Sequence, residues 1–469
     1  MCIRDRTWTR LWPTQRLAVA KMAIVGAGLV GSLWARMLGN RGHDVTVYER
    51  RPDPRNQNLH GGRSINLALS DRGWKALELA GVAEAVRDIA LPIRGRRMHA
   101  VDGTKTFQPY GLEGQCIYSV SRAGLNRILV ECAEQMPKVR FAFDHRCHGY
   151  TRKEEAVHIH LETGGQTMDV EVDQIFGTDG AFSAVRGRMA RNDRFDFEQR
   201  YLAHGYKEVP MLPGPDGGFQ MEEDGLHIWP RGHFMLMALP NPDKTFTCTL
   251  FGPYEGPDGL NALDTGEKVK AFFETHFPDV VPLLPHLVED WNRHPVSSLV
   301  MIRCWPWNDG GQVALMGDAS HAIVPFYGQG MNSGMEDCTI LDGLMDAHGS
   351  WDEILEAYTA QRKPAGDAIL ELALKNYVEM RDLTGDPSFL LQKKLEARLQ
   401  KAHPDRWIPL YSQVTFSHIP YDKALERGQQ QQRAMASVMS KPEAWNHFED
   451  DGWMEHVLQH LEQETSRAE

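Results

Sequence analysis

The sequence lacks the features that would place the chain in a membrane, around a metal or within a disulfide framework. Its seven cysteines are scattered, odd in number and free of Cys-x-x-Cys pairs, so neither disulfides nor zinc is predicted. The longest apolar run, Phe234 to Leu239, is far shorter than the roughly 18 residues of a membrane helix. No Lys/Arg tract occurs beyond the first stretch and the formal charge is −12, which argues against nucleic acid as a partner. We therefore expect a soluble protein of a reducing cytoplasm.

The beginning of the chain differs from the rest in composition. Four arginines stand against a single aspartate in the first twenty residues, which faintly resembles a transit peptide. We expect residues 1–20 to be an unstructured leader or an artefactual extension rather than a targeting signal. The whole chain has 469 residues with 42% apolar composition, enough for two or three cooperating domains around substantial cores.

A glycine motif follows the first expected strand. Residues 18–25 (AVAKMAIV) are apolar apart from Lys21, as in a parallel strand covered on both faces, and run directly into GAGLVG. In this motif Gly26 permits a tight turn, Gly28 lets the backbone approach a pyrophosphate, and Gly31 allows the next helix to pack closely. The N-terminus of that helix then faces the anion, so the motif predicts a dinucleotide site.

An acidic residue at the expected distance completes the dinucleotide signature. We expect a helix over residues 29–41, ended by Gly42, and then a strand over 45–48 that leads to Glu49. A carboxylate at this place binds the ribose hydroxyls of an adenosine. Because NAD and FAD both carry that ribose, the choice between them needs a second signal.

Two later segments favour FAD. They are GTDGAFSAVR at residues 177–186 and ALMGDASHAIVPFYGQGMNSGMEDC at residues 314–338, and an NAD dehydrogenase needs neither. In the second segment an apolar strand over 313–316 leads to Asp318, whose carboxylate can accept hydrogen bonds from ribityl hydroxyls. The glycine turn that follows opens a helix through Leu344. Its free N–H groups and dipole would stabilise negative charge on a reduced flavin near N1 and C2=O.

With these motifs in this order, the chain resembles the flavoprotein aromatic hydroxylases of the p-hydroxybenzoate hydroxylase fold. Four further segments resemble the kynurenine 3-monooxygenase family more narrowly: ERRPDPR at 49–55, GRSINLALSDRG at 62–73, LHIWPRG at 226–232 and NYVEM at 376–380. The resemblance covers about residues 21–442. It implies an α/β fold in which a Rossmann-like FAD-binding domain is interrupted by a mainly β substrate domain and followed by a C-terminal helical region.

The division of the chain implied by this resemblance is discontinuous. Residues 21–190 and 296–370 would form the FAD-binding domain, and residues 191–295 the mainly β substrate domain. Residues 371–469 would form a C-terminal helical cap over the substrate pocket.

The resemblance also implies a set of FAD contacts inside the matched motifs. With the glycines of the first loop they are Gly26, Gly28, Gly31, Glu49, Arg50, Arg51, Pro52, Ala68, Arg122, Asp318, Gln329, Gly330, Met331 and Asn332. The period-two alternation of GRSINLALS predicts a half-buried strand, on which the small Ala68 leaves room beside the flavin ring. Arg122 begins a helix from which its side chain can reach the pyrophosphate, although a solvated arginine is the alternative.

The substrate implied by the resemblance is L-kynurenine, an aniline ring with an amino-acid tail. The family arginine that binds the tail carboxylate matches Arg94 in LPIRGRRMH, and a planar guanidinium suits bidentate pairing. The neighbouring Arg96 and Arg97 leave the register open. The family's remaining polar contacts match Tyr110, Asn376 and Tyr411.

Each of these residues also has a purely structural interpretation. Asn376 falls in the middle of an expected helix, where asparagine has poor propensity, so burial towards a ligand competes with exposure to solvent. Tyr110 and Tyr411 are equally compatible with ordinary core tyrosines.

Tyr327, in PFYGQGMN, stands where the family has His or Phe, and an extra hydroxyl beside the flavin is expected to alter substrate preference. His321 is left without a role, because most of the 20 histidines are surface or packing residues.

The reaction implied by the resemblance is a monooxygenation. NADPH reduces FAD, dioxygen adds at flavin C4a, and the distal oxygen of the hydroperoxide goes to the ring carbon ortho to the aniline nitrogen, giving 3-hydroxykynurenine. The cofactor carries this chemistry, so no catalytic side chain and no metal are expected. The alternatives are a flavin hydroxylase of another aromatic acid and a non-catalytic flavin-fold binding protein, and the sequence leaves the oligomeric state open, a homodimer included.

Overall fold

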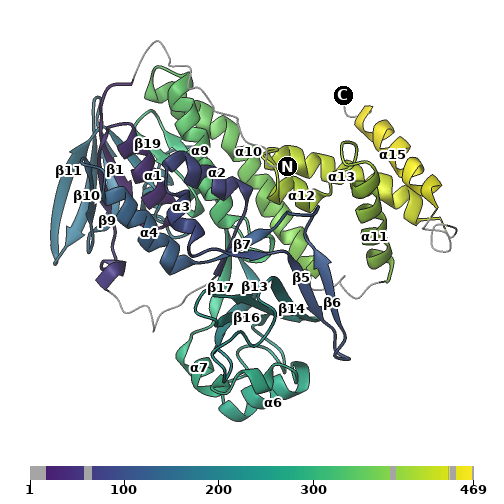
Figure 1. The fold of residues 1–469 in the computed structure, drawn as a ribbon. Helices are drawn as coiled ribbons and strands as arrows, with labels where there is room; N and C mark the ends of the chain where they lie inside the picture. Colours follow the sequence, from purple (N-terminus) through teal and green to yellow (C-terminus); the bar gives the residue numbers. More distant parts are fainter. Residues whose placement is uncertain (1–16, 57–65, 381–386, 442, 444–449, 467–469) are drawn as a thin grey trace.

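The computed structural model describes residues 17–56, 66–380, 387–441, 443 and 450–466. It has the expected α/β architecture, with a mainly parallel sheet on one side, a larger mainly antiparallel sheet below it and a group of C-terminal helices on the other side (Figure 1). Most of the expected leader lies outside the described residues. None of the described helices is both long enough and apolar enough to cross a membrane.

The nucleotide side of the molecule is a six-stranded sheet in the order β18-β19-β12-β1-β2-β8. All neighbouring strands are parallel except the pair β18 and β19. The expected first strand begins only at Lys21, because Ala18 and Val19 are exposed, and its last four residues are buried. The strands are β1 (Lys21–Val25), β2 (Asp44–Tyr48), β8 (Val139–Ala142), β12 (Gln174–Gly177), β18 (Asn308–Asp309) and β19 (Val313–Leu315).

Five helices and two small sheets surround this sheet. The helices are α1 (Leu29–Asn40), α2 (Asp71–Ala80), α3 (Ala83–Arg87), α4 (Arg122–Glu134) and α5 (Ala184–Met189), with a 3-10 turn η1 (Pro54–Asn56). One small sheet has the order β3-β7-β4 and consists of β3 (Asn66–Leu69), β7 (Ile117–Ser121) and β4 (Leu91–Ile93). The other has the order β11-β10-β9 and consists of β9 (Arg146–Arg152), β10 (Val157–Thr163) and β11 (Gln166–Val172).

The alternation expected for β3 is wrong in its details. Asn66, expected on the polar face, is buried, whereas Leu67 is only half-buried. The reason is that the Asn66 amide donates to the Ser119 hydroxyl (3.1 Å) and to the Pro240 carbonyl (3.0 Å), which satisfies it inside the protein. Residues 57–65, which begin the matched segment, lie outside the described residues.

The second large sheet has seven strands in the order β17-β13-β16-β15-β14-β5-β6. The strands are β5 (Gly95–His99), β6 (Lys105–Pro109), β13 (Asp196–Met211), β14 (Gly225–Arg231), β15 (Phe234–Pro240), β16 (Phe246–Pro253) and β17 (Ser297–Trp305). Helices α6 (Gly266–His276) and α7 (Leu287–Arg293), with η3 (Val281–Leu283), lie at its lower end in Figure 1. Because β5, β6 and β17 fall outside residues 191–295, the sheet ties the expected substrate domain to both halves of the FAD domain. The proposed domain limits themselves stay a prediction.

The remaining helices run from the nucleotide side to the far side of the molecule. They are α8 (Asp318–His321), η4 (Pro325–Tyr327), α9 (Gly330–Ala347), α10 (Trp351–Val378), α11 (Pro387–Ala402), α12 (Leu410–Thr415), α13 (Tyr421–Met439) and α15 (Asp451–Ser466). The long helix α10 joins the two sides, and α13 and α15 form the yellow end of the chain in Figure 1. The expected C-terminal helical region is therefore present, whereas its role as a cap over the substrate pocket stays a prediction.

Candidate functional site

The glycine loop has the geometry of a phosphate-binding turn. Gly26 has a φ of +104°, and a Cβ on it would lie 2.7 Å from the carbonyl oxygen of Thr178. A Cβ on Gly31 would lie 2.0 Å from the carbonyl oxygen of Gly26, so α1 packs on the strand at van der Waals limits. At Gly28, by contrast, a Cβ would meet no atom within 4 Å. The loop is therefore closed towards the protein and open at the one glycine that has to admit a pyrophosphate, which fits FAD.

The side chain of Glu49, directly after β2, is fixed by hydrogen bonds. Its carboxylate accepts hydrogen bonds from the backbone N–H of Ala27 (2.9 Å) and from Nε of Arg51 (2.9 Å). Burial opposes its ionisation, but the hydrogen bonds and charge of Arg51 and the Ala27 N–H hold the pKa of Glu49 below its ordinary value. Arg50, Arg51 and Pro52 are exposed, so their contacts with FAD stay predictions.

The second cofactor segment begins at a strained glycine. Gly317 has a φ of +59°, and its N–H donates to the Asp337 carboxylate (2.8 Å). Directly after it, Asp318 begins α8 with an exposed side chain, free to accept hydrogen bonds from a ligand. The conformation that points Asp318 outwards is thus fixed from the inside of the protein.

The flavin loop, residues 328–332, leads into α9. The Asn332 amide donates to the carbonyls of Ala68 and Gly328 (2.8 Å each), and its oxygen accepts from the Ser70 N–H (2.9 Å). The Gln329 side chain accepts from the Tyr421 hydroxyl (2.9 Å). Since both side chains are engaged within the protein, their expected contacts with FAD are best made by backbone N–H groups at the start of α9, which have no partner inside the helix.

The positions of Ala68 and Arg122 agree with their expected surroundings. Ala68 is half-buried, and its Cβ lies 3.0 Å from where a Cβ on Gly328 would be, so only small residues fit where β3 meets the flavin loop. Arg122 begins α4, where the Ser121 hydroxyl accepts the N–H of Gly124 (3.3 Å), and its own side chain is exposed. Its reach to a pyrophosphate stays a prediction.

Four side chains from distant parts of the chain form what we call the tyrosine cluster: Arg96, Tyr110, Tyr327 and Tyr411. The rings of Tyr110 and Tyr411 stack at 5.1 Å, and those of Tyr327 and Tyr411 at 5.6 Å. The Arg96 guanidinium lies 5.5 Å from the ring centre of Tyr110 and 5.1 Å from that of Tyr411. Sequence positions more than 300 residues apart, 96 and 411, thus meet in one aromatic site with a cation.

The assignment of the carboxylate-binding arginine to Arg94 disagrees with this geometry. Arg94 stands in the break between β4 and β5 with an exposed side chain, and Arg97 pairs with Asp224 (2.7 Å). Arg96 alone of the three places its guanidinium against the Tyr110 ring, whereas Arg94 meets Tyr110 only through its backbone carbonyl, which accepts the Tyr110 N–H (3.2 Å). The Arg96 Nε is buried without a hydrogen-bond partner among the described residues. An unsatisfied buried guanidinium nitrogen is costly unless a ligand uses it. The geometry therefore favours Arg96, two residues further along the motif than Arg94, as the carboxylate-binding arginine, and the choice between them stays a prediction.

Asn376 is buried in α10, as predicted against its alternative of solvent exposure. Its amide nitrogen donates to the carbonyl of Phe326 (2.6 Å), next to Tyr327 of the cluster. The Phe326 ring stacks on Tyr377 at 4.0 Å, which fixes α10 against η4. Asn376 therefore borders the tyrosine cluster, whereas its direct contact with a substrate stays a prediction.

Burial controls the ionisation of the cluster. It raises the pKa of Tyr110, an effect that the charge and hydrogen bond of Arg96 only partly offset. Burial likewise raises the pKa of Tyr327 and Tyr411. The three phenols are accordingly protonated at neutral pH and able to donate hydrogen bonds, and Arg96 supplies the positive charge.

A buried ion network beneath the flavin loop was missed from the sequence. It consists of Arg72, His321, Glu336, Asp337 and Arg362. The Asp337 carboxylate accepts from Arg362 Nε (2.7 Å) and lies 2.7 Å from His321 Nε2, while Glu336 pairs with both arginines. Although burial opposes it, the charges of His321 and Arg362 hold the pKa of Asp337 low. Adjacent acids on α9, in GMEDC, were the available signal, since two carboxylates inside a buried helix require cations.

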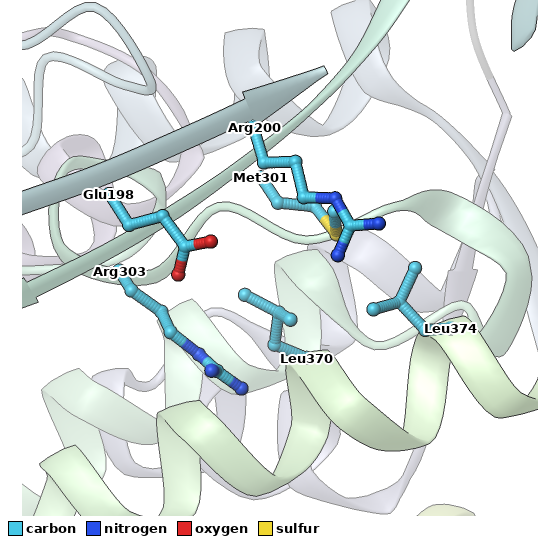
Figure 2. A pocket seen from close by; sticks show the side chains of 6 residues that line it. All are labelled: Glu198, Arg200, Met301, Arg303, Leu370 and Leu374. Atoms are coloured by element: carbon cyan, nitrogen blue, oxygen red, sulfur yellow. The ribbon is translucent and has the colours of Figure 1, made fainter. Parts of the chain in front are cut away.

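A small hollow of about 60 Å³ lies elsewhere, between α10 and the paired strands β13 and β17. Figure 2 shows three charged and three apolar side chains around it: Glu198, Arg200, Arg303, Met301, Leu370 and Leu374. None of the expected site residues lines this hollow. Among the described residues no group of three or more His, Cys, Asp or Glu is placed to hold a metal ion, and the six described cysteines are free thiols.

The chain resembles known proteins over most of its length. Residues 19–373 match the family described as FAD binding domain. The chain is 46% identical over 432 residues to the kynurenine 3-monooxygenase of Christiangramia forsetii, covering 91% of this chain and 96% of the relative. It is 42% identical over 439 residues to that of Dictyostelium discoideum, covering 91% and 94%. Among solved structures, tetrameric 2-methyl-3-hydroxypyridine-5-carboxylic acid oxygenase has a similar fold, with a TM-score of 0.65 at 19% identity over 81% of this chain and 98% of that chain.

Proposed function

The chain belongs to the FAD binding domain family and, within it, to the kynurenine 3-monooxygenases, and from that premise we propose how its residues carry out the reaction. The protein is an FAD-dependent enzyme that hydroxylates L-kynurenine at C3. We assign its tail-binding site to the tyrosine cluster. The observation that supports this site is the buried Arg96 Nε, which has no partner among the described residues, on a guanidinium that lies beside the stacked rings of Tyr110 and Tyr411.

The cofactor is held by the two loops already described. Gly28 leaves room for the pyrophosphate, Glu49 would bind the adenosine ribose and Asp318 would accept hydrogen bonds from the ribityl chain. When bound, FAD supplies the redox chemistry and the activation of dioxygen. The N–H groups that begin α9 would face negative charge on a bound flavin, and they would need no rearrangement because Asn332 and Gln329 are fixed by side-chain hydrogen bonds.

The amino-acid tail of kynurenine is bound by Arg96. Its guanidinium donates to the carboxylate, and the hydroxyls of Tyr110 and Tyr411, protonated because burial raises their pKa values, add neutral donors. The stacked rings form an apolar wall for the aniline. Asn376 holds the backbone at Phe326 and so fixes the position of Tyr327 at the opposite side of the cluster.

Orientation and exclusion of water are the main contributions of the protein to the chemical step. The aniline nitrogen already enriches the ortho carbon in electrons, so the ring has only to be presented to the activated oxygen. Helices α10 and α12 cover the cluster with Asn376 and Tyr411, and water is kept from the reactive oxygen. We further propose NADPH as the electron donor, so that kynurenine, NADPH, a proton and dioxygen give 3-hydroxykynurenine, NADP⁺ and water.

The reaction is tested with purified protein reconstituted with FAD. We expect a yellow protein that consumes NADPH much faster with L-kynurenine than without it, and a product heavier by one oxygen that coelutes with 3-hydroxykynurenine. Hydroxylation of a benzoate or phenol in place of kynurenine would establish the alternative flavin hydroxylase. Binding of FAD without any hydroxylated product from either class would instead favour a non-catalytic flavoprotein.

A further inference from the structure

The flavin loop is held from two sides by parts of the chain that are far apart in sequence. On one side Asn332 binds the backbone of Ala68, within β3, and of Ser70, directly after it. On the other side the Tyr421 hydroxyl, at the first residue of α13, donates to Gln329 Oε1 at 2.9 Å. Gln329 is 1% exposed and Tyr421 fully buried, so no water competes for this hydrogen bond.

Tyr421 is itself fixed by a buried cation. The Arg72 guanidinium lies 4.0 Å from the centre of the Tyr421 ring. Its Nε donates to the carbonyl of Val414 (3.1 Å), and its Nη2 donates to the carbonyl of Ile419. These two carbonyls belong to the end of α12 and to the connection from α12 to α13. Arg72 thus binds both the segment between α12 and α13 and the ring of Tyr421, the first residue of α13.

The same cation is anchored beneath the loop. Arg72 Nη1 pairs with Glu336, which also pairs with Arg362, and Arg362 in turn binds Asp337. Asp337 receives the N–H of Gly317, the residue before Asp318. The network sets two arginines against two acids, so it is stable when buried only if every partner is in place. The docking of α12 and α13 and both cofactor segments therefore share one set of contacts.

We propose that Tyr421 is a positioning residue that makes the redox behaviour of the bound flavin depend on the docking of α12 and α13; this rests on the proposed FAD contacts of the flavin loop. The Tyr421 hydroxyl fixes the Gln329 side chain, which sets the path of the backbone into α9. The N–H groups of that turn stabilise the reduced flavin. A loop released on this side holds its N–H groups less well aligned, so the reduced flavin is stabilised less.

The experiment uses the full-length holoenzyme with Tyr421→Phe, which keeps the ring over Arg72 and removes only the hydroxyl. We expect FAD to remain bound, the flavin midpoint potential to become more negative, and the rate of flavin reduction by NADPH to fall three- to tenfold while the KM for kynurenine stays within twofold. Tyr150→Phe is the matched control, because Tyr150 is also buried and its hydroxyl donates to Asp309 (2.7 Å), which is not part of the flavin loop. It should leave the potential and the reduction rate unchanged.

A double-mutant cycle separates coupling from general loosening. Adding Tyr421→Phe to Gln329→Met should cause no further loss of reduction rate or potential, because the hydrogen bond is already absent. Additive effects, or a Tyr421→Phe enzyme with the potential and reduction rate of the parent, would overturn the proposal. A parent protein that binds no FAD would instead contradict the proposed function, and that result is obtained before any variant is made.

Discussion

The glycine loop and the tyrosine cluster, which we propose as sites for FAD and for the kynurenine tail, are built in different ways. The glycine loop consists of six consecutive residues, and its shape depends on backbone atoms and on the absence of side chains. Gly26 and Gly31 pack against neighbouring backbone atoms, whereas Gly28 has free space where a Cβ would be. At the tyrosine cluster four side chains come from β5, the end of β6, η4 and α12. The first site depends on local conformation, whereas the second exists only when the whole chain is folded.

This difference explains why residues of the glycine loop are easier to assign from the sequence than residues of the tyrosine cluster. A turn that needs glycine at three positions has one register, so its sequence identifies it directly. A segment with three arginines in four residues can be aligned with a family motif in several ways, each of which puts a different arginine at the binding position. The structure separates them because Arg94 is exposed, Arg97 pairs with Asp224, and only Arg96 contacts the tyrosine rings. Substitutions should therefore act differently at the two sites.

The largest effect is expected at the glycine loop from Gly28→Val. The φ and ψ of Gly28, −77° and −172°, are accessible to any residue, and its Cβ meets no protein atom within 4 Å, so the apoprotein should fold. The added side chain would occupy the pyrophosphate position and weaken FAD binding about a thousandfold, roughly 4 kcal/mol. Fluorescence titration with FAD measures this. Gly343→Val, at an equally open position on α9, is the control and should bind FAD normally; similar affinities of the two variants would contradict the assignment.

Acid should destabilise the sheet that carries the cluster. On that sheet His99 lies on β5, the strand of Arg96, and its Nε2 is 2.9 Å from Nδ1 of His227. Burial lowers the pKa of His99 from 6.5 to about 4. As the pH falls the unfolded chain binds the proton first, so stability is greatest above pH 6.5 and declines between 6.5 and 4, by at most about 3 kcal/mol. Urea unfolding at a series of pH values tests this. In His99→Gln the decline should be smaller, and an equally steep decline would exclude His99 as its cause.

A smaller effect is expected from Asn376→Leu. The substitution keeps the volume inside α10 but leaves the Phe326 carbonyl without its donor (2.6 Å), which costs about 1 to 3 kcal/mol and shifts Tyr327. The KM for kynurenine should rise about tenfold, on the order of 1.4 kcal/mol, with FAD affinity unchanged. Steady-state kinetics and FAD titration on the same preparation provide both values. A fall in FAD affinity with normal KM would place Asn376 with the cofactor instead.

The smallest effect is expected from Tyr110→Phe. The ring still stacks on Tyr411 and still contacts Arg96, so only the hydrogen bonding of the hydroxyl, which includes Arg96, is lost. This loss costs about 1 kcal/mol, or roughly a fivefold rise in KM. Tyr110→Leu, which also removes the stacking, should raise KM further. If the two variants behave alike, the hydroxyl rather than the ring is what matters at this position.

The fold and cofactor were largely predictable from the sequence, because strand, loop, helix and acid follow each other without interruption. The expected helix over 29–41 differs from α1 by one residue, and FAD is confirmed by the family match. The side-chain arrangement at β3 was not predictable, since Asn66 is buried through bonds to residues far along the chain. The network around Asp337 also depends on tertiary contacts, because Arg362 lies on α10, 25 residues further along the chain than Asp337.

The central claim, that the tail of kynurenine binds Arg96 in the tyrosine cluster, is tested most directly by titrating two flavin-loaded variants with L-kynurenine. Binding is followed through the flavin absorbance. We predict that Arg96→Met raises the kynurenine Kd about a hundredfold, roughly 2.7 kcal/mol, with FAD still bound, whereas Arg94→Met binds like the parent. Loss of kynurenine binding in Arg94→Met with normal binding in Arg96→Met would contradict the account.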